Sequence, residues 1–221
     1  MTTLISSPLA PLLHRLFAEA DAAAATTMAA VGDIPADELA RLRVSKTDYL
    51  DFYGRLKDAP IPVSRETGVL LYMLARSAKA RSIVEFGTSF GISTLHLAAA
   101  LRDNGGRKLI TTEFEASKIA RARDNLAAGG VIDLVEIRAG DALQTLKADL
   151  PETIDLLLLD GAKGLYPDVL ALVEDRMRPG ALVVADDADA SPDYLARVRS
   201  ARHGYLSTPF GDDVEVSMRL I

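Results

Sequence analysis

The chain has 221 residues with no cysteine, 31 acidic side chains and 25 Lys or Arg side chains, so its formal net charge is −6. This length fits one domain, or one domain with a helical extension, and the apolar and charged fractions are those of a globular protein. Without cysteine, disulfides, thiolate catalysis, zinc–thiolate sites and iron–sulfur clusters are excluded. An acidic chain without a basic run is also a poor partner for nucleic acid or an anionic membrane.

The first residues do not have the pattern of a targeting sequence. Residues 1–11 are apolar and uncharged, and His14 and Arg15 follow this run, whereas a secretory signal begins with basic residues. No segment approaches the roughly 18 uncharged apolar residues of a membrane-spanning helix. We therefore expect a cytoplasmic protein with no membrane partner.

Residues 1–60 predict an N-terminal helical arm. Residues 8–30, 37–44 and 46–56 have helix-forming composition and no strand pattern. The arm is interpreted as a lid over an active site or a contact with a second subunit, with helices that merely cover the sheet as the equal alternative. Its aromatic residues are expected in the core or a subunit contact rather than in a substrate pocket, although a pocket wall stays open as an alternative: Tyr49, Phe52 and Tyr53.

Ser64 is predicted to be the N-cap of a helix that ends near Lys79. From this helix onward the pattern alternates between strands and helices. Strands are predicted at 82–86, 108–112, 134–138, 154–159 and 181–185, and helices near 91–103, 115–128, 142–149, 165–175 and 192–201. Strand-like runs at 204–209 and 214–220 have no helix between them and predict an antiparallel hairpin. The expected fold is α/β, a doubly wound and mostly parallel seven-stranded sheet that ends in this hairpin.

A glycine turn follows the first predicted strand. Gly87 would let the backbone turn sharply near a ligand, and Gly91 would allow tight packing where the next helix begins. Glu85 is expected to point its carboxylate into the crevice at the carboxyl end of the sheet. The middle glycine of the dinucleotide fingerprint is missing, which favours a ligand with an amine over a pyrophosphate.

Glu113 ends the second predicted strand, about 20 residues beyond the glycine turn, where an acidic side chain binds ribose hydroxyls. Together with the turn and Glu85 it predicts a nucleoside ligand rather than a purely structural turn. Glu113 alone does not separate NAD from S-adenosylmethionine, because both contain ribose.

Two buried strands end in aspartates. Asp160 follows the fourth strand, and Asp186 and Asp187 follow the fifth, so neighbouring strands would bring the three carboxylates together at the sheet edge. Such a cluster attracts a cation, and oxygen ligands favour Mg²⁺, Mn²⁺ or Ca²⁺. Lys163 lies in the same loop, either as a general base or as a surface charge. The alternative for the aspartates is helix capping and solubility.

These residues resemble the class I S-adenosylmethionine-dependent methyltransferases, specifically the cation-dependent catechol and caffeoyl-CoA O-methyltransferase group. The resemblance covers roughly residues 60–221, with its strongest motifs at 61–63, 85–93, 140–142 and 211–217. It implies a methyltransferase domain over 61–221 that binds the cofactor through Val63, Glu85, Gly87, Ser89, Gly91, Ser93, Glu113, Asp141, Ala142 and Asp160. It further implies metal ligation by Asp160, Asp186 and Asp187, and catalysis by Lys163 and Asp160.

The resemblance implies methyl transfer to a hydroxyl oxygen of a small phenolic or catechol-like acceptor, and a homodimer. Asp187 stands where this group usually has asparagine, and a third carboxylate would weaken the ion as a Lewis acid. Gly161 and Ala162 replace larger residues, which would remove bulk near the acceptor. Two other functions remain open: an NAD-linked oxidoreductase on a similar sheet, and a methyltransferase-like binding module without catalysis.

Overall fold

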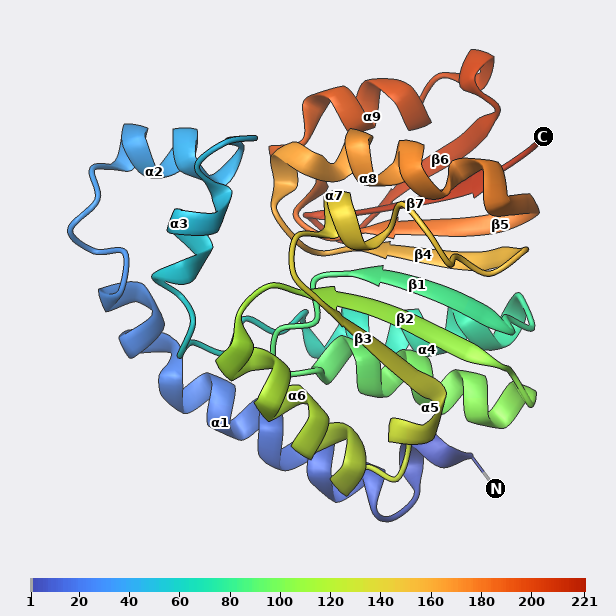
Figure 1. The fold of residues 1–221 in the computed structure, drawn as a ribbon, viewed down its shortest axis with the longest axis horizontal. Coiled ribbons are helices and arrows are strands. Elements are labelled where there is room, and N and C mark those ends of the chain that lie inside the picture. Colours follow the sequence, from blue (N-terminus) through green and yellow to red (C-terminus); the bar gives the residue numbers. More distant parts are fainter. Residues whose placement is uncertain (1) are drawn as a thin grey trace.

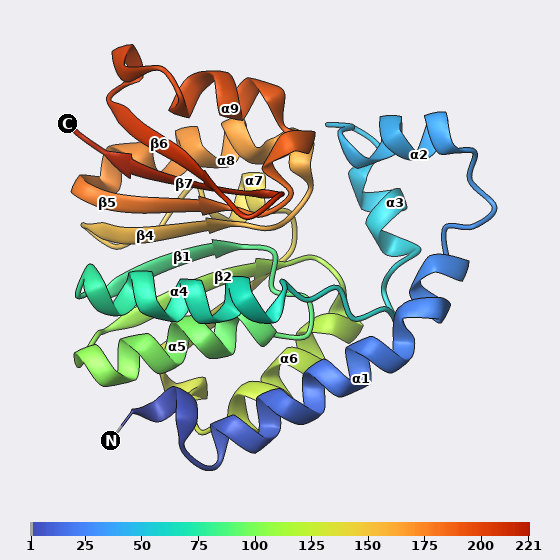
Figure 2. The ribbon, with the colours of Figure 1, turned by 180° about the vertical axis from the view of Figure 1, so that it is seen from behind.

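The computed structural model describes residues 2–221 and contains one seven-stranded sheet with helices on both faces (Figure 1, Figure 2). The strands are β1 Ser82–Phe86, β2 Lys108–Glu113, β3 Val135–Ala139, β4 Ile154–Leu159, β5 Met177–Ala185, β6 Tyr205–Phe210 and β7 Val214–Arg219. Their order is β3-β2-β1-β4-β5-β7-β6, and β7 runs antiparallel to β5 and β6. The predicted fold class is therefore confirmed, including the terminal hairpin.

The helices are α1 Leu9–Ala29, α2 Ala36–Arg43, α3 Tyr49–Gly54, α4 Arg65–Ser77, α5 Ile92–Asn104, α6 Ala116–Ala128, α7 Ala142–Thr145, α8 Tyr166–Val173 and α9 Pro192–Val198. Short 3-10 turns lie at Thr3–Ile5, Ile132–Leu134, Lys163–Leu165, Glu174–Arg176, Ala188–Ala190 and Ala201–His203. Ser64 caps α4 as predicted, since its side chain accepts a hydrogen bond from the Thr67 backbone N–H. Across residues 2–221 no helix combines the length and apolar character needed to cross a membrane.

Alternate residues of the strands build two separate cores. Ile83 of β1 packs in the core that α1, α4, α5 and α6 cover, and Val84 packs in the core under α7, α8 and α9. This alternation follows from the period of two along a strand, and both faces of the sheet are apolar because helices cover both. Figure 1 shows the two helical layers below and above the sheet.

Several elements differ from their predicted bounds, and α7 and β5 each differ by four residues at one end. α7 ends at Thr145, because the Arg138 guanidinium donates hydrogen bonds to the carbonyls of Thr145, Ala148 and Asp149 and holds a non-helical turn there. β5 begins at Met177, four residues before the predicted start. Pro179 and Gly180 are typical turn residues, but both lie within β5. The pairing of β4 with β5 has a register shift between Ile154 and Leu156, next to this part of the strand.

The predicted arm divides into two parts. The buried face of α1, residues 9–20, belongs to the main core beside α5 and α6. Residues 30–59, here called the cap segment, form a small core of their own around Phe52, Leu56 and Ala59. In Figures 1 and 2, α2 and α3 of this segment stand apart from the helices that cover the sheet. The cap segment is therefore the part of the arm that does not cover the sheet.

Candidate active site

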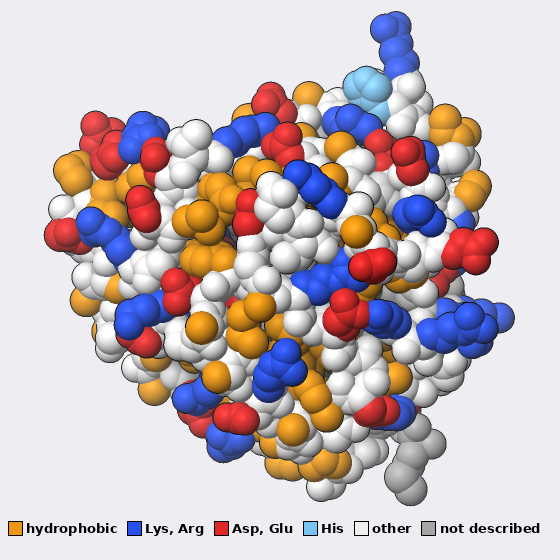
Figure 3. Space-filling view, viewed as in Figure 1, with side chains coloured by type: hydrophobic (Ala, Val, Ile, Leu, Met, Phe, Trp, Pro, Cys, Tyr) orange, Lys and Arg blue, Asp and Glu red, His pale blue; other side chains and the backbone are white. Residues whose placement is uncertain are grey.

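A cleft of about 500 Å³ lies between the cap segment and the carboxyl ends of β1, β2, β4 and β5. Its cap-side wall is largely apolar and includes Val31, Leu39, Phe52, Tyr53 and Leu56. Figure 3 shows apolar side chains gathered between the cap segment and the sheet. The crevice outside the carboxyl ends of a parallel sheet is where ligands bind in open α/β folds.

The turn after β1 requires glycine at Gly87. Its φ is +103°, and a Cβ atom there would lie 2.5 Å from the Asp160 carbonyl oxygen. The Asp160 backbone N–H also donates to the Phe86 carbonyl at 2.8 Å, which holds the ends of β4 and β1 together. Asp160, the first predicted metal ligand, therefore lies directly beside the glycine turn.

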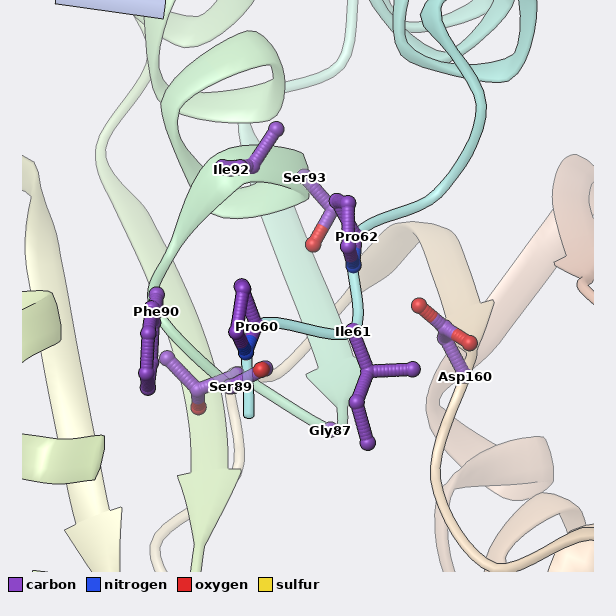
Figure 4. A pocket seen from close by; sticks show the side chains of 10 residues that line it. Pro60, Ile61, Pro62, Gly87, Ser89, Phe90, Ile92, Ser93 and Asp160 are labelled. Carbon is purple, nitrogen blue, oxygen red and sulfur yellow. The ribbon is translucent and has the colours of Figure 1, made fainter. Parts of the chain in front are cut away.

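Glu85 lies beneath the turn, and not in the crevice as expected. It is fully buried, and its two oxygens accept hydrogen bonds from the hydroxyls of Ser93 at 2.7 Å and Thr94 at 2.6 Å. Burial is the main cause that raises the pKa of Glu85 to about 7, although these hydroxyls oppose the shift. Ser93 lines a small pocket beside Pro60–Pro62, shown in Figure 4, so Glu85 can act on a ligand there through Ser93.

The end of the cleft beside β2 is organised around Glu113. Its Oε2 accepts the Ser89 backbone N–H at 2.9 Å, and its Oε1 accepts the backbone N–H groups of Phe114 at 3.0 Å and Glu115 at 3.1 Å. Within residues 2–221, the buried hydroxyl oxygens of Ser89 and Thr112 have no hydrogen-bond partner, and both residues line the cleft. Orphaned buried hydroxyls beside a fixed carboxylate fit a polar ligand such as a nucleoside.

The predicted acidic edge forms as expected for Asp160 and Asp186. β4 and β5 are parallel neighbours, and the Asp186 backbone N–H donates to the Leu159 carbonyl at 2.9 Å. The Lys163 ammonium donates a hydrogen bond to Asp160 Oδ1 at 3.1 Å and lies 3.4 Å from Asp187 Oδ2. Lys163 is only 5% exposed, so the alternative that it is a surface charge is wrong.

Burial and mutual repulsion perturb this cluster. Burial, followed by the charge of Asp160, raises the pKa of Asp186 to about 8. Burial also raises the pKa of Asp160, although Lys163 opposes the shift. Burial lowers the pKa of Lys163, but the surrounding acidic groups, led by Tyr166 and Asp160, outweigh it and raise that pKa well above its ordinary value. Lys163 is therefore an ammonium ion within this cluster.

The acidic edge also meets the cap segment. Arg43 at the end of α2 lies 3.4 Å from Asp187 Oδ2, and the Lys46 ammonium donates to Asp168 at 2.6 Å. A Cβ atom at Gly164 would collide with the Val44 carbonyl, so this glycine allows the cap segment to approach the loop after β4. The cap segment therefore contacts the loops after β4 and β5 at this end of the cleft.

The donor set suits a hard divalent cation. Asp160, Asp186 and Asp187 supply carboxylate oxygens from adjacent strand ends, and oxygen ligands of this kind suit Mg²⁺, Mn²⁺ or Ca²⁺. In the part of the chain that the structure describes, no group of three His, Asp or Glu side chains is arranged so that it could hold a metal ion. Lys163 instead contacts two of the three carboxylates.

Most of the predicted site residues meet in this cleft, whereas Val63, Glu85 and Gly91 lie behind its wall. Those that line the cleft or its small pocket are Gly87, Ser89, Ser93, Glu113, Asp141, Ala142, Asp160, Lys163, Asp186 and Asp187. The aromatic residues of the arm pack in or against the hydrophobic cores, as expected, and they also line the cleft, which was the alternative left open: Tyr49, Phe52 and Tyr53. Sequence reasoning missed Arg43 and Lys118 because each stands in an unremarkable helical stretch.

Gly161 does not open the acceptor end as expected. A Cβ atom at Gly161 would lie 2.5 Å from the Phe86 ring, so the ring already fills the space that a larger residue would take. Ala162 is buried and still lines the cleft. The shape of this wall therefore depends on Phe86 together with Gly161.

Comparison with known proteins shows which family this chain is similar to. The methyltransferase domain family matches residues 84–188. The chain is 35% identical to catechol O-methyltransferase of Niastella koreensis over 130 residues, which is 58% of this chain and 58% of that protein. It is 30% identical over 148 residues to a Mycolicibacterium smegmatis protein that bears an O-methyltransferase name, which is 63% of this chain and 70% of that protein. The chain thus spans less than two thirds of the Niastella enzyme but more than two thirds of the second relative.

A solved structure extends the likeness to nearly the whole fold. The O-methyltransferase TomG from Streptomyces achromogenes, involved in tomaymycin synthesis and solved in complex with S-adenosylmethionine, superposes with a TM-score of 0.66 at 26% identity. The superposition covers 89% of this chain and 96% of TomG.

Proposed function

We propose that this chain, which belongs to the S-adenosylmethionine-dependent O-methyltransferase family, transfers a methyl group from S-adenosylmethionine to a hydroxyl oxygen of a small phenolic acceptor with a divalent cation present. The observation that carries this proposal is the buried Lys163 among three aspartates, directly beside the glycine turn, in a cleft with an apolar far wall. Family membership gives no support to the NAD-linked alternative.

The cofactor end is assigned to the turn and to Glu113. Glu113 would accept hydrogen bonds from the ribose hydroxyls, and the orphaned Ser89 hydroxyl would gain a partner. The Ser93 hydroxyl donates a hydrogen bond to Glu85, which leaves the lone pairs of the Ser93 oxygen to accept a hydrogen bond from the cofactor amine. Asp141 and Ala142 line the adenine side, where Tyr49 has its pKa raised to about 12 by burial and by Asp141.

The reaction end is assigned to the acidic edge. When bound, S-adenosylmethionine supplies an electrophilic methyl group, and a divalent cation held by Asp160, Asp186 and Asp187 supplies a Lewis acid that acidifies the acceptor hydroxyl. Because the pKa of Lys163 is raised, its ammonium would stabilise the deprotonated acceptor oxygen by charge rather than accept the proton as a base. Asp160 holds this ammonium in place.

The cap segment would act as the lid. Its apolar side chains would cover the body of an aromatic acceptor and exclude water, which strengthens every charge interaction at the reacting oxygen. We also propose, from the resemblance alone, a homodimer in the cytoplasm. Light scattering on the purified protein tests the dimer.

Calorimetry can separate an enzyme from a binding module. We expect S-adenosylhomocysteine to bind and NAD not to bind, and a catechol to bind the S-adenosylhomocysteine complex only when Mg²⁺ is added. Binding of S-adenosylhomocysteine without binding of any phenolic acceptor would support a module without catalysis. Binding of NAD in its place would refute the proposed function.

A further inference from the structure

Lys118 lies in the first turn of α6, at the nucleoside end of the cleft. It is only 4% exposed, yet it lines the cleft together with Glu113, Phe114 and Glu115. A buried ammonium group is costly unless charged or polar groups satisfy it. A lysine in this position therefore needs an explanation beyond solubility.

The protein itself does not satisfy this ammonium. Considering residues 2–221, Lys118 makes no hydrogen bond and no ion pair with the protein. Burial lowers its pKa, and the nearby carboxylates of Glu113 and Glu115 oppose that shift without contacting it. The Lys118 ammonium is thus a hydrogen-bond donor without a protein partner, at the lining of the cleft.

The neighbouring carboxylate of Glu113 indicates which ligand groups the Lys118 ammonium could bind. Its Oε2 accepts one backbone N–H and its Oε1 accepts two, so the carboxylate still has capacity for a hydroxyl donor on Oε2. A hydroxyl that donates to Glu113 keeps lone pairs of its own, and in a buried site these need a donor. An acceptor and a cationic donor side by side match the two adjacent hydroxyls of a ribose.

We propose that Lys118 is a further cofactor-binding residue, which donates a hydrogen bond to a ribose hydroxyl oxygen while Glu113 accepts from the ribose hydroxyls. The inference rests on the proposed function, because it takes the nucleoside of S-adenosylmethionine as the ligand. It makes the site selective for an intact 2′,3′-diol, since a deoxyribose would leave the buried ammonium without a partner.

Calorimetry with S-adenosylhomocysteine and its 2′-deoxy and 3′-deoxy analogues tests the proposal. Lys118→Met keeps the length of the side chain and removes the charge, and it should weaken binding of S-adenosylhomocysteine about tenfold, or ~1.4 kcal/mol. Lys118→Arg should retain most of the affinity. Lys147→Met is the matched control, because Lys147 is an exposed lysine outside the cleft. Thermal unfolding of each variant checks that it is folded.

The deoxy analogues give the decisive comparison. The analogue that lacks the contacted hydroxyl should bind wild type and Lys118→Met equally. The proposal is wrong if Lys118→Met binds S-adenosylhomocysteine as tightly as wild type, or if it weakens all three ligands alike. Failure of wild type to bind S-adenosylhomocysteine would refute the proposed function as well, whereas the other two results would leave it standing.

Discussion

Glu85 gives a stability prediction that follows from its burial alone. Its carboxylate is fully buried, which raises its pKa from 4.5 to about 7. The folded protein therefore keeps this proton up to about pH 7, whereas the unfolded chain releases it near 4.5. Between these values the folded state binds more protons, so the free energy of unfolding falls as the pH rises, and above pH 7 this contribution no longer changes.

The size of the effect follows from the two pKa values. A shift from 4.5 to about 7 corresponds to at most roughly 3 kcal/mol, of which about 2 kcal/mol falls between pH 5 and pH 7.5. Glu85→Gln keeps an oxygen that can accept from Ser93 or Thr94 but cannot titrate. Relative to wild type, the variant should therefore gain about 2 kcal/mol of stability between these two pH values.

Urea unfolding of both proteins at pH 5 and pH 7.5 measures this difference directly. The comparison between variants cancels the titration of other groups. Glu152→Gln, at an exposed position, should show no pH-dependent difference from wild type. A Glu85→Gln difference that is the same at both pH values would refute the raised pKa and the burial argument behind it.

Three other substitutions test the site. Lys163→Met should lower kcat by ~10²-fold or more with little change in S-adenosylhomocysteine affinity. Partial activity in Lys163→Arg would support a role through charge, whereas full activity of Lys163→Met would contradict the assignment. Asp187→Asn should weaken Mn²⁺ binding about tenfold in calorimetry but raise kcat at saturating Mg²⁺, and tighter Mn²⁺ binding would oppose the ligand role. Gly164→Ala should push the cap segment away and raise the acceptor KM while leaving S-adenosylhomocysteine binding unchanged; an unaltered KM would show that this contact does not shape the acceptor pocket.

The acidic edge could be predicted because its position depends only on strand ends. Asp160 and Asp186 each follow a buried apolar run, and neighbouring parallel strands bring such ends together. The same period of two could have corrected the orientation of Glu85. It shares a face with Ile83, which packs toward α5, so its carboxylate is directed under the helix and not into the crevice.

The helices of the cap segment could be predicted from the sequence, but its contacts with the sheet edge could not. Arg43 meets Asp187 across a gap of more than a hundred positions, and no local pattern encodes such a pairing. Gly161 was expected to leave open space in the cleft, because the sequence does not show that the Phe86 ring, from another strand, fills the space beside it. Lys118 occupies a helix whose exposed basic residues gave no sign that this one is buried.

Transfer of a labelled methyl group is the most direct test of the proposed function. The protein would be incubated with S-adenosylmethionine carrying a ¹³C-methyl group, a catechol acceptor and Mg²⁺, and the product examined by NMR spectroscopy. We predict a ¹³C-methoxy signal on the acceptor that is lost when a chelator removes the ion and returns when Mg²⁺ is restored. Label that stays on the cofactor across a broad panel of phenolic acceptors would contradict methyl transfer to oxygen, and a signal unaffected by chelator would contradict the role given to the three aspartates.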